Sequence, residues 1–204
     1  MTTQHTQSIL NQFSDLYDLT ELDLTESKIS VLKPLTSLTK LTKLWLGINQ
    51  VKNIKPLGSL TNLDFLGLSG NKIRVLKPLT PLTNLTRLYL SNNQIEDIKS
   101  LESLNNLRVL DIAYNQISDI ERLASLTNLT KLWLENNKII DVKPLASLTN
   151  LTWLSLGNNR ICDIKPLASL TNLTWLILKN NHISIVDIQW LGDKLPNCHI
   201  VTTS

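Results

Sequence analysis

Residues 129–150 read LTKLWLENNKIIDVKPLASLTN, and this 22-residue unit decides the fold. Its pattern, LxxLxLxxNxIxxIxxLxxLxx, fills eight consecutive repeats from Leu19 to Lys194. The asparagine column keeps this period without slippage, with Ser27 one period before its members Asn49, Asn71, Asn93, Asn115, Asn137, Asn159 and Asn181. A fixed period over so many units predicts a solenoid, in which each unit stacks on its neighbours.

The first half of each repeat alternates apolar and variable residues, which is the pattern of a β-strand. In the quoted unit we expect Leu132 and Leu134 to point inward, whereas Lys131, Trp133 and Glu135 point outward. One strand cannot bury its apolar side alone, so neighbouring strands are expected to form a parallel sheet over a shared core.

The second half spaces its apolar residues three apart, as in Val142, Leu145 and Leu148, and includes Pro144. This spacing favours short 3₁₀ turns or extended segments over an α-helix. We therefore expect a curved coil with the sheet on its concave side and tight turns on its convex side.

The asparagine column has a structural explanation. An asparagine amide carries two donor hydrogens and an acceptor oxygen, and the column lies where each strand bends inward. There it can pair backbone groups of adjacent turns that would otherwise be buried without partners. We interpret the column as a structural ladder rather than as a track for a polar ligand.

Both ends of the chain depart from the repeat. Residues 1–18 form a half-repeat, in which Ser8–Phe13 is expected to cover the first strand as a short helical turn. At the other end, a count of 22 from Leu173 predicts a ninth strand at Leu195–Val201, with Cys198 in the inward fourth column and Ile200 in the sixth.

A helix is expected just before that strand. Val186, Trp190 and Leu191 have helical spacing, which predicts a capping helix at Asp187–Lys194. The chain is thus one domain, 1–204, with a half-repeat at 1–18, eight repeats at 19–194 and a C-terminal cap at 187–204.

Composition excludes several partners. The net charge of +3 without runs of like charge argues against nucleic acid, and no apolar stretch is long enough to span a membrane. Lysines in one column lie beside an acidic column, and we interpret them as a solvated face with short-range charge pairing: Lys33, Lys55, Lys77, Lys99, Lys143 and Lys165, with Asp97, Asp119, Asp141 and Asp163. Residues 1–5 lack the features of a secretory signal, so we expect a cytoplasmic chain, or an extracellular one if a signal peptide has been removed.

No residues form a catalytic constellation. The three histidines are far apart in the pattern, no metal-ligand spacing occurs and phosphate-binding loops are missing. We therefore expect no enzyme activity, no cofactor and no metal. Cys198 is expected in the core and Cys162 on the surface, two turns apart and beyond disulfide reach, which favours a reducing compartment.

Aromatic residues concentrate in the two outward strand columns, which hold four of the five tryptophans. Exposed tryptophans on neighbouring strands are typical of a binding surface, although aromatic residues also stabilise sheets by stacking. The candidate partner-binding residues are Trp45, Phe65 and Tyr89, then Trp133, Trp153, Trp175 and Ile177, and between and around them Lys43, Arg87, Asp111, Lys131 and Glu135.

The run ICDIKPLASLTNLT at residues 161–174 resembles the internalin type of bacterial leucine-rich repeat, and the resemblance covers nearly all of residues 10–204. It implies an α/β-type leucine-rich-repeat solenoid, a right-handed curved coil with about nine parallel strands on a concave face that binds proteins. Internalins are secreted or wall-attached adhesins with a helical N-terminal cap domain, often followed by an immunoglobulin-like domain.

Three functions fit these observations. The favoured hypothesis is a monomeric, non-catalytic protein–protein interaction module. The alternatives are a glycan or cell-wall binder, such as a surface adhesin, and a structural scaffold without a dedicated ligand.

Overall fold

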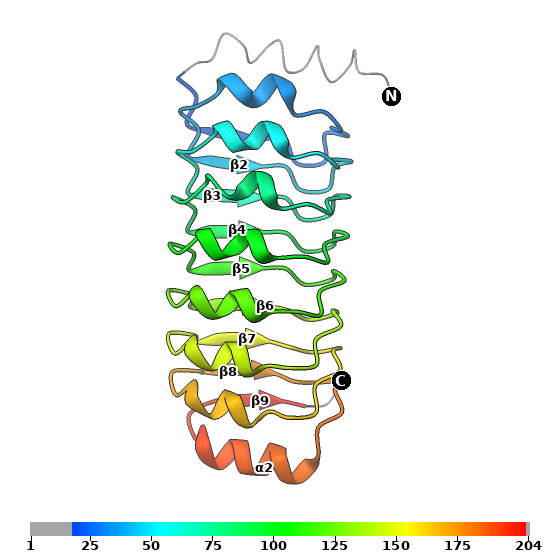
Figure 1. Cartoon of the computed structure of the whole chain (residues 1–204), viewed down its shortest axis with the longest axis vertical. Coiled ribbons are helices and arrows are strands. Elements are labelled where there is room, and N and C mark those ends of the chain that lie inside the picture. The colour runs from blue at the N-terminus through cyan, green and yellow to red at the C-terminus, as the bar shows by residue number, and fades with distance from the viewer. Residues whose placement is uncertain (1–17, 203–204) are drawn as a thin grey trace.

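The computed structural model describes residues 18–202. Nine three-residue strands pair side by side in sequence order and form one parallel sheet (Figure 1). Their bounds are β1 Glu21–Asp23, β2 Lys43–Trp45, β3 Phe65–Gly67, β4 Arg87–Tyr89, β5 Val109–Asp111, β6 Lys131–Trp133, β7 Trp153–Ser155, β8 Trp175–Ile177 and β9 His199–Val201. The predicted sheet of nine parallel strands is confirmed.

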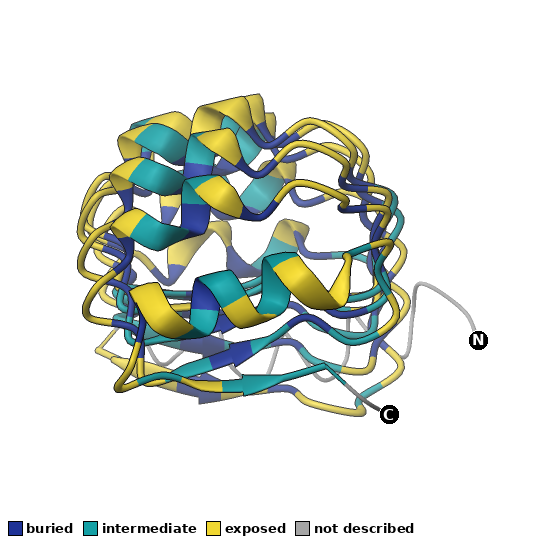
Figure 2. Ribbon diagram, turned by 90° about the horizontal axis from the view of Figure 1, so that it is seen from below, coloured by how far each residue is buried: buried dark blue, intermediate teal, exposed yellow. Residues whose placement is uncertain are grey.

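Short 3₁₀ helices (η) lie opposite the sheet, as the three-residue spacing predicts. They are η1 Lys33–Ser37, η2 Lys55–Ser59, η3 Lys77–Leu79, η4 Lys99–Ser103, η5 Glu121–Ser125, η6 Lys143–Ser147 and η7 Lys165–Ser169. The view along the stack shows two layers, with the buried residues facing the space between the helices and the sheet (Figure 2). The predicted helical turn at Ser8–Phe13 lies outside the described residues.

The core is one continuous column of leucine and isoleucine. The middle residue of each strand from β1 to β8 is a buried leucine, and the register pairs each of these leucines with the next, as in Leu132 with Leu154. Leu132 and Leu134 are both fully buried. Because every strand repeats this orientation, its first and third residues face outward.

The asparagine ladder is confirmed. In a typical turn, the Oδ1 atom of Asn71 accepts the N–H of Val51 at 2.9 Å. Its Nδ2 atom donates to the carbonyl oxygens of Leu46 at 2.9 Å and Leu68 at 3.0 Å. One side chain thus satisfies backbone groups of its own turn and of the preceding turns, which would otherwise be buried without partners.

A second asparagine ladder lies on the surface. Each member donates from Nδ2 to a carbonyl oxygen 23 residues earlier, as Asn128 does to Asn105 at 2.8 Å. Its members are Asn62, Asn84, Asn106, Asn128, Asn150 and Asn172. This ladder joins neighbouring turns without burying the amide.

The acidic column does something other than the charge pairing we expected. The carboxylate of Asp141 accepts the backbone N–H of Lys143 at 2.8 Å, where η6 begins. The carboxylates of Asp97, Asp119 and Asp163 likewise accept the backbone N–H of the residue two positions later. Such a bond fixes a turn locally, so the column shapes the start of each 3₁₀ helix, and the neighbouring lysines stay exposed.

The predicted capping helix is present as α2, Ile185–Lys194, and Ser184 caps it by accepting the N–H of Asp187 at 3.1 Å. The helix begins two residues before the predicted Asp187. Leu191 is buried and Trp190 packs against the core, whereas Val186 is 68% exposed.

The strand after α2 is shifted by two residues from the expected count. Trp175 pairs with His199 and Leu176 with Ile200, so Ile200 holds the fourth column and Cys198 lies before the strand. The ten-residue helix makes this last unit longer than 22 residues, and the count of 22 therefore failed here. A shift of two residues leaves the inward and outward sides unchanged.

Both cysteines are free, and Cys162 is exposed as predicted. Cys198 is half-buried beside the core rather than part of the fourth column. Burial raises the pKa of its thiol to about 11.

One backbone position has a positive φ in all eight repeats, and Lys28 in the first repeat adds a further case. The shared position follows the strand by three residues, and its occupants are Glu26, Ile48, Gly70, Asn92, Tyr114, Asn136, Asn158 and Asn180. Asparagine and glycine tolerate this left-handed region, whereas bulky or β-branched residues are strained in it. Ile48 (φ 53°) and Tyr114 (φ 53°) therefore occupy unfavourable positions, and both side chains are more than half exposed.

Replacement of Asn115 by leucine is expected to lower the free energy of unfolding by about 1–3 kcal/mol. The substitution removes the partners of the Ile95 N–H and the Leu90 carbonyl. Urea denaturation measures the change. Asn128→Leu is the matched control, because this exposed side chain serves one carbonyl group, and it should cost less than about 1 kcal/mol. Equal losses in the two variants would contradict the structural role of the buried ladder.

Replacement of Tyr114 by asparagine is expected to raise the free energy of unfolding by about 1 kcal/mol, because it relieves the strain at positive φ. The reverse change in the same column, Asn92→Tyr, starts from a φ of 54° and should destabilise the chain by a similar amount. Denaturant titration tests both variants, and a stabilised Asn92→Tyr would refute the argument.

A thiol reagent at about pH 8 is expected to modify Cys162 fast and Cys198 slowly. With a pKa of about 11, about one thousandth of Cys198 is thiolate at that pH, and the thiolate is the reactive form. A rise in pH toward 10 should accelerate Cys198, because its thiolate fraction grows with pH. Two equally fast cysteines at about pH 8 would contradict this assignment.

Candidate functional site

The surface that varies most between repeats is the sheet face, which we define as the side chains of the first and third residues of each strand. Parallel pairing in register places residues of the same column next to one another, as with Lys131 and Trp153. Neighbouring strands lie about 4.8 Å apart. Large side chains in one column therefore touch along the sheet.

The first three candidate aromatic residues form what we call the N-terminal aromatic cluster. The ring centroid of Phe65 lies 4.8 Å from that of Trp45 and 5.4 Å from that of Tyr89. The guanidinium carbon of Arg87 lies 5.5 Å from the centroid of the Phe65 ring, which is within the range of a cation–π contact. The structure thus brings four of the predicted site residues together on β2–β4.

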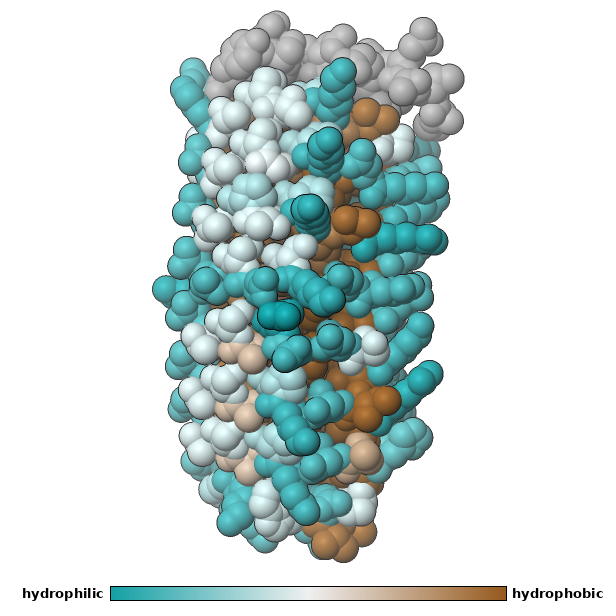
Figure 3. Space-filling view, viewed as in Figure 1, coloured by the Kyte–Doolittle hydropathy of each residue, from teal (hydrophilic) through white to brown (hydrophobic). Residues whose placement is uncertain are grey.

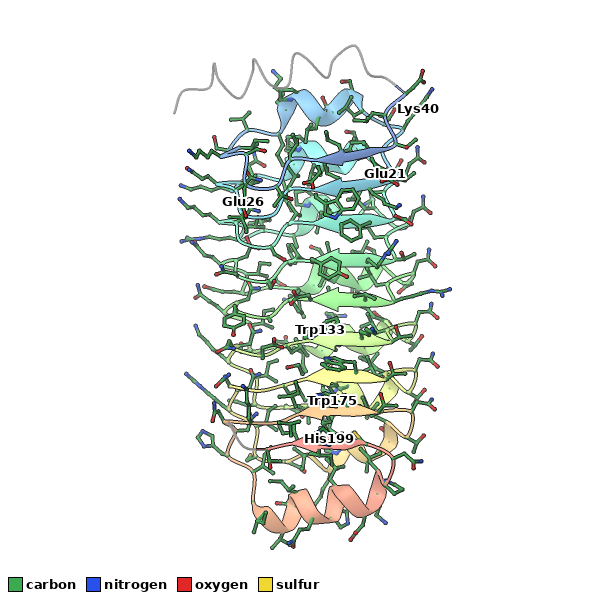
Figure 4. All side chains as sticks on the ribbon, turned by 180° about the vertical axis from the view of Figure 1, so that it is seen from behind. Glu21, Glu26, Lys40, Trp133, Trp175 and His199 are labelled. Atoms are coloured by element: carbon green, nitrogen blue, oxygen red, sulfur yellow. The ribbon has the colours of Figure 1, made fainter. Side chains whose placement is uncertain are left out.

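The C-terminal aromatic cluster comprises Trp133, Trp153, Trp175, Ile177 and His199. Ring centroids are separated by 6.2 Å between Trp133 and Trp153, by 5.3 Å between Trp153 and Trp175, and by 4.3 Å between Trp175 and His199. Trp133, Trp175 and His199 lie in line along the sheet (Figure 4). The rings of Trp153 and Trp175 are stacked with an interplanar angle of 2°.

Our sequence-based selection missed His199. The count of 22 placed the last strand two residues out of register, and His199 was therefore not assigned to the column of Trp153 and Trp175. The length of the capping helix was the only signal that the last unit is longer than the others.

The aromatic side chains are half-buried rather than fully exposed, because each ring covers its neighbours. The indole Nε1 atom of Trp153 is buried and has no hydrogen-bond partner. A buried donor without a partner is costly, so stacking alone leaves this group unsatisfied.

Two basic residues at the N-terminal end of the sheet face are in ion pairs. Lys43 Nζ lies 2.6 Å from Glu21 Oε1, and Arg87 Nη2 lies 3.8 Å from Asp64 Oδ2. Lys131, near the middle of the sheet, is exposed, and no ion pair of the described residues includes it.

A hollow of about 280 Å³ opens between the two aromatic clusters. The register places Asp111 of β5 between Tyr89 and Trp133, so a small side chain stands between two large ones. We call it the Asp111 hollow, and its lining residues are Tyr89, Ser91, Asp111, Ala113, Tyr114, Trp133 and Glu135. Predicted site residues from both clusters thus meet at one depression.

Burial raises the pKa of Asp111, and hydrogen bonds from the Ser91 side chain and the Ala113 N–H offset this effect only in part. The Ala113 N–H donates to Asp111 Oδ1 at 3.1 Å. The Oε2 atom of Glu135 is buried and has no hydrogen-bond partner. The hollow thus holds one carboxyl group whose charge burial disfavours and another with an unsatisfied oxygen.

The helical side carries a larger apolar groove of about 690 Å³ between η2 and η3. Val75, Pro78, Pro81 and Gly58 line it together with lysines that include Lys55 and Lys77. Seen from this side, hydrophobic residues form a narrow strip between hydrophilic bands (Figure 3). The two lysines belong to a column that recurs throughout the scaffold, so their presence does not mark this groove as a site.

Residues 18–202 contain no group of three or more histidine, cysteine or acidic residues that could hold a metal ion. Among these residues, every helix is too short or too polar to cross a membrane.

Comparisons with known proteins identify the family. The model "Leucine Rich repeats (2 copies)" matches five overlapping segments, at residues 39–84, 61–103, 83–125, 105–147 and 127–169. A search of curated proteins found no match.

Solved structures agree with this family. Internalin C2 of Listeria monocytogenes is 38% identical with a TM-score of 0.88, over 94% of this chain and 83% of the other. An internalin of the same species, internalin F, is 27% identical with a TM-score of 0.67, over 98% of this chain and 73% of the other.

A leucine-rich-repeat protein of Leptospira interrogans is 27% identical with a TM-score of 0.72, over 93% of this chain and 62% of the other. With five repeat matches and a relative of 38% identity over most of both chains, this chain belongs to the leucine-rich-repeat family, as a bacterial internalin-like member.

Proposed function

We propose that this chain is a non-catalytic module that binds a protein partner along its sheet face, with the C-terminal aromatic cluster as the main anchor. The leucine-rich-repeat fold supports a protein-interaction role in general. The sheet face and its aromatic anchor are the specific parts of the proposal.

The observation that carries it is the run of four rings from Trp133 to His199 on four neighbouring strands. Half-exposed tryptophans in such a run are costly in water and are enriched among residues that dominate binding energies. The buried Nε1 atom of Trp153 has no hydrogen-bond partner, so the stacked arrangement carries a cost that sheet stability does not explain. Stacking stabilises the sheet, but it explains neither the exposed part of the tryptophan rings nor the unpartnered Nε1 atom of Trp153.

Ring orientation favours a protein over a glycan. Sugars stack on the faces of aromatic rings, whereas here the rings of Trp153 and Trp175 lie between aromatic neighbours on either side. Their edges and the Ile177 side chain remain for contact, which suits interdigitation with apolar side chains of a protein.

We also propose that the chain acts as a monomer in a reducing compartment such as the cytoplasm. Two free cysteines, one of them exposed, support this location.

The test compares three forms of the purified chain in capture experiments from lysate: the unchanged chain, Trp153→Ala with Trp175→Ala, and the control Val75→Ala with Ile140→Ala. Val75 and Ile140 are exposed apolar residues outside the sheet face, at 62% and 57%. Quantitative mass spectrometry is expected to show proteins that the unchanged chain and the control retain and that the tryptophan variant loses by about tenfold or more.

Far-ultraviolet circular dichroism and thermal melts confirm that each variant is folded. Retention of every captured protein by a folded tryptophan variant would overturn the proposal. If captured proteins were lost only in the Val75/Ile140 control, the helical side would instead be identified as the binding surface. A glycan array with the same three forms tests the alternative, and tryptophan-dependent glycan binding would also count against a protein partner.

A further inference from the structure

We propose that the Asp111 hollow captures one cationic side chain of the protein partner, a lysine ammonium or an arginine guanidinium group. This inference rests on the proposed function, because the hollow opens on the sheet face between its two aromatic clusters. It adds the requirement that the partner carry a positive charge at this point, which the aromatic clusters alone do not demand.

The lining of the hollow suits a cation. Tyr89 and Trp133 flank Asp111 directly through the strand register, and Tyr114 stands at the exposed edge. Aromatic rings attract a cation through their electron-rich faces, and carboxylates attract it through charge. A volume of about 280 Å³ lies just below the range of small-molecule sites, about 300–1,000 Å³, and therefore suits one side chain.

Asp23, whose column neighbour on β2 is Trp45, shows what burial changes. Asp23 and Asp111 occupy the same column, and each accepts the N–H two residues ahead, at 2.9 Å from Thr25 and 3.1 Å from Ala113. Hydrogen bonds with Thr25 lower the pKa of the open Asp23, whereas burial raises that of Asp111. The charge of Asp111 thus lacks stabilisation that a bound cation would supply.

Among residues 18–202, no cation pairs with either carboxylate of the hollow, Asp111 or Glu135. The Oε2 atom of Glu135 is buried without any hydrogen-bond partner, and a buried acceptor of that kind is costly unless a donor arrives. The ammonium and guanidinium groups carry several donors each, and both carboxylates line the hollow that such a group would enter.

Backbone strain at the edge of the hollow also supports a binding role for it. Tyr114 holds a φ of 53° in a column where four of eight residues are asparagine. Strained backbone positions of this kind cluster at functional sites. Tyr114 extends the aromatic wall of the hollow, which gives its strained position a role in binding.

The experiment titrates the chain with N-acetyl-arginine amide and N-acetyl-lysine amide, and with the neutral N-acetyl-citrulline amide as control. Nuclear magnetic resonance follows the Ala113 amide and the Trp133 indole. The cationic probes are expected to bind saturably with a Kd on the order of millimolar, and citrulline should bind several-fold more weakly. The stronger of the two cations identifies the preferred side chain.

Asp111→Asn and Glu135→Gln remove one charge each and keep the size of the side chain. Each is expected to weaken cation binding by about threefold or more, whereas the matched control Asp23→Asn should leave it unchanged. Asp111→Asn should fold normally, because burial already disfavours its charged form. Equal binding of citrulline and arginine, or unchanged binding in both variants, would overturn the inference.

Capture from lysate separates this inference from the proposed function. If the tryptophan variant loses the partner but Asp111→Asn binds both partner and probes unchanged, the hollow has no such role and the proposed function stands. If the probes bind as expected but the tryptophan variant keeps every partner, the proposed function fails while the cation site remains.

Discussion

The buried amide of each ladder asparagine is the interaction on which the rest of the structure depends. It closes the bend after strands β2 to β8 by satisfying backbone groups of its own turn and of the preceding turn, as Asn71 does. Without it, the inward turn would carry buried groups with no partner. Because the same bonds recur in each repeat, all strands start in the same register, and side chains 22 residues apart become neighbours on the sheet.

Much of the fold follows from that periodicity. The alternation around Leu132 and the three-residue spacing around Leu145 predict strand and 3₁₀ helix correctly, because burial of one side imposes both patterns. Prediction fails where the period changes. The two extra residues around α2 moved Cys198 out of the core column and brought His199 beside Trp175, and no count based on 22 residues detects them.

The candidate site was predictable as a set of columns but not as a shape. Column counting correctly places Phe65 next to Trp45 and Trp153 next to Trp175. It does not show that stacked rings bury one another's faces, nor that a short side chain at Asp111 leaves a depression. Both depend on side-chain size and orientation in three dimensions. The role of the acidic column was missed for a similar reason, because a bond from Asp141 to the nearby backbone competes with pairing to lysine.

The position of β5 between the two aromatic clusters has an evolutionary consequence. Since each repeat contacts only its neighbours, duplication or deletion of one unit at this point would move the clusters apart or together by one strand spacing, about 4.8 Å. Each cluster would stay intact, because its rings touch within β2–β4 or within β6–β9. The solenoid thus separates the distance between the two aromatic clusters from their chemistry, and copy number alone can adjust that distance.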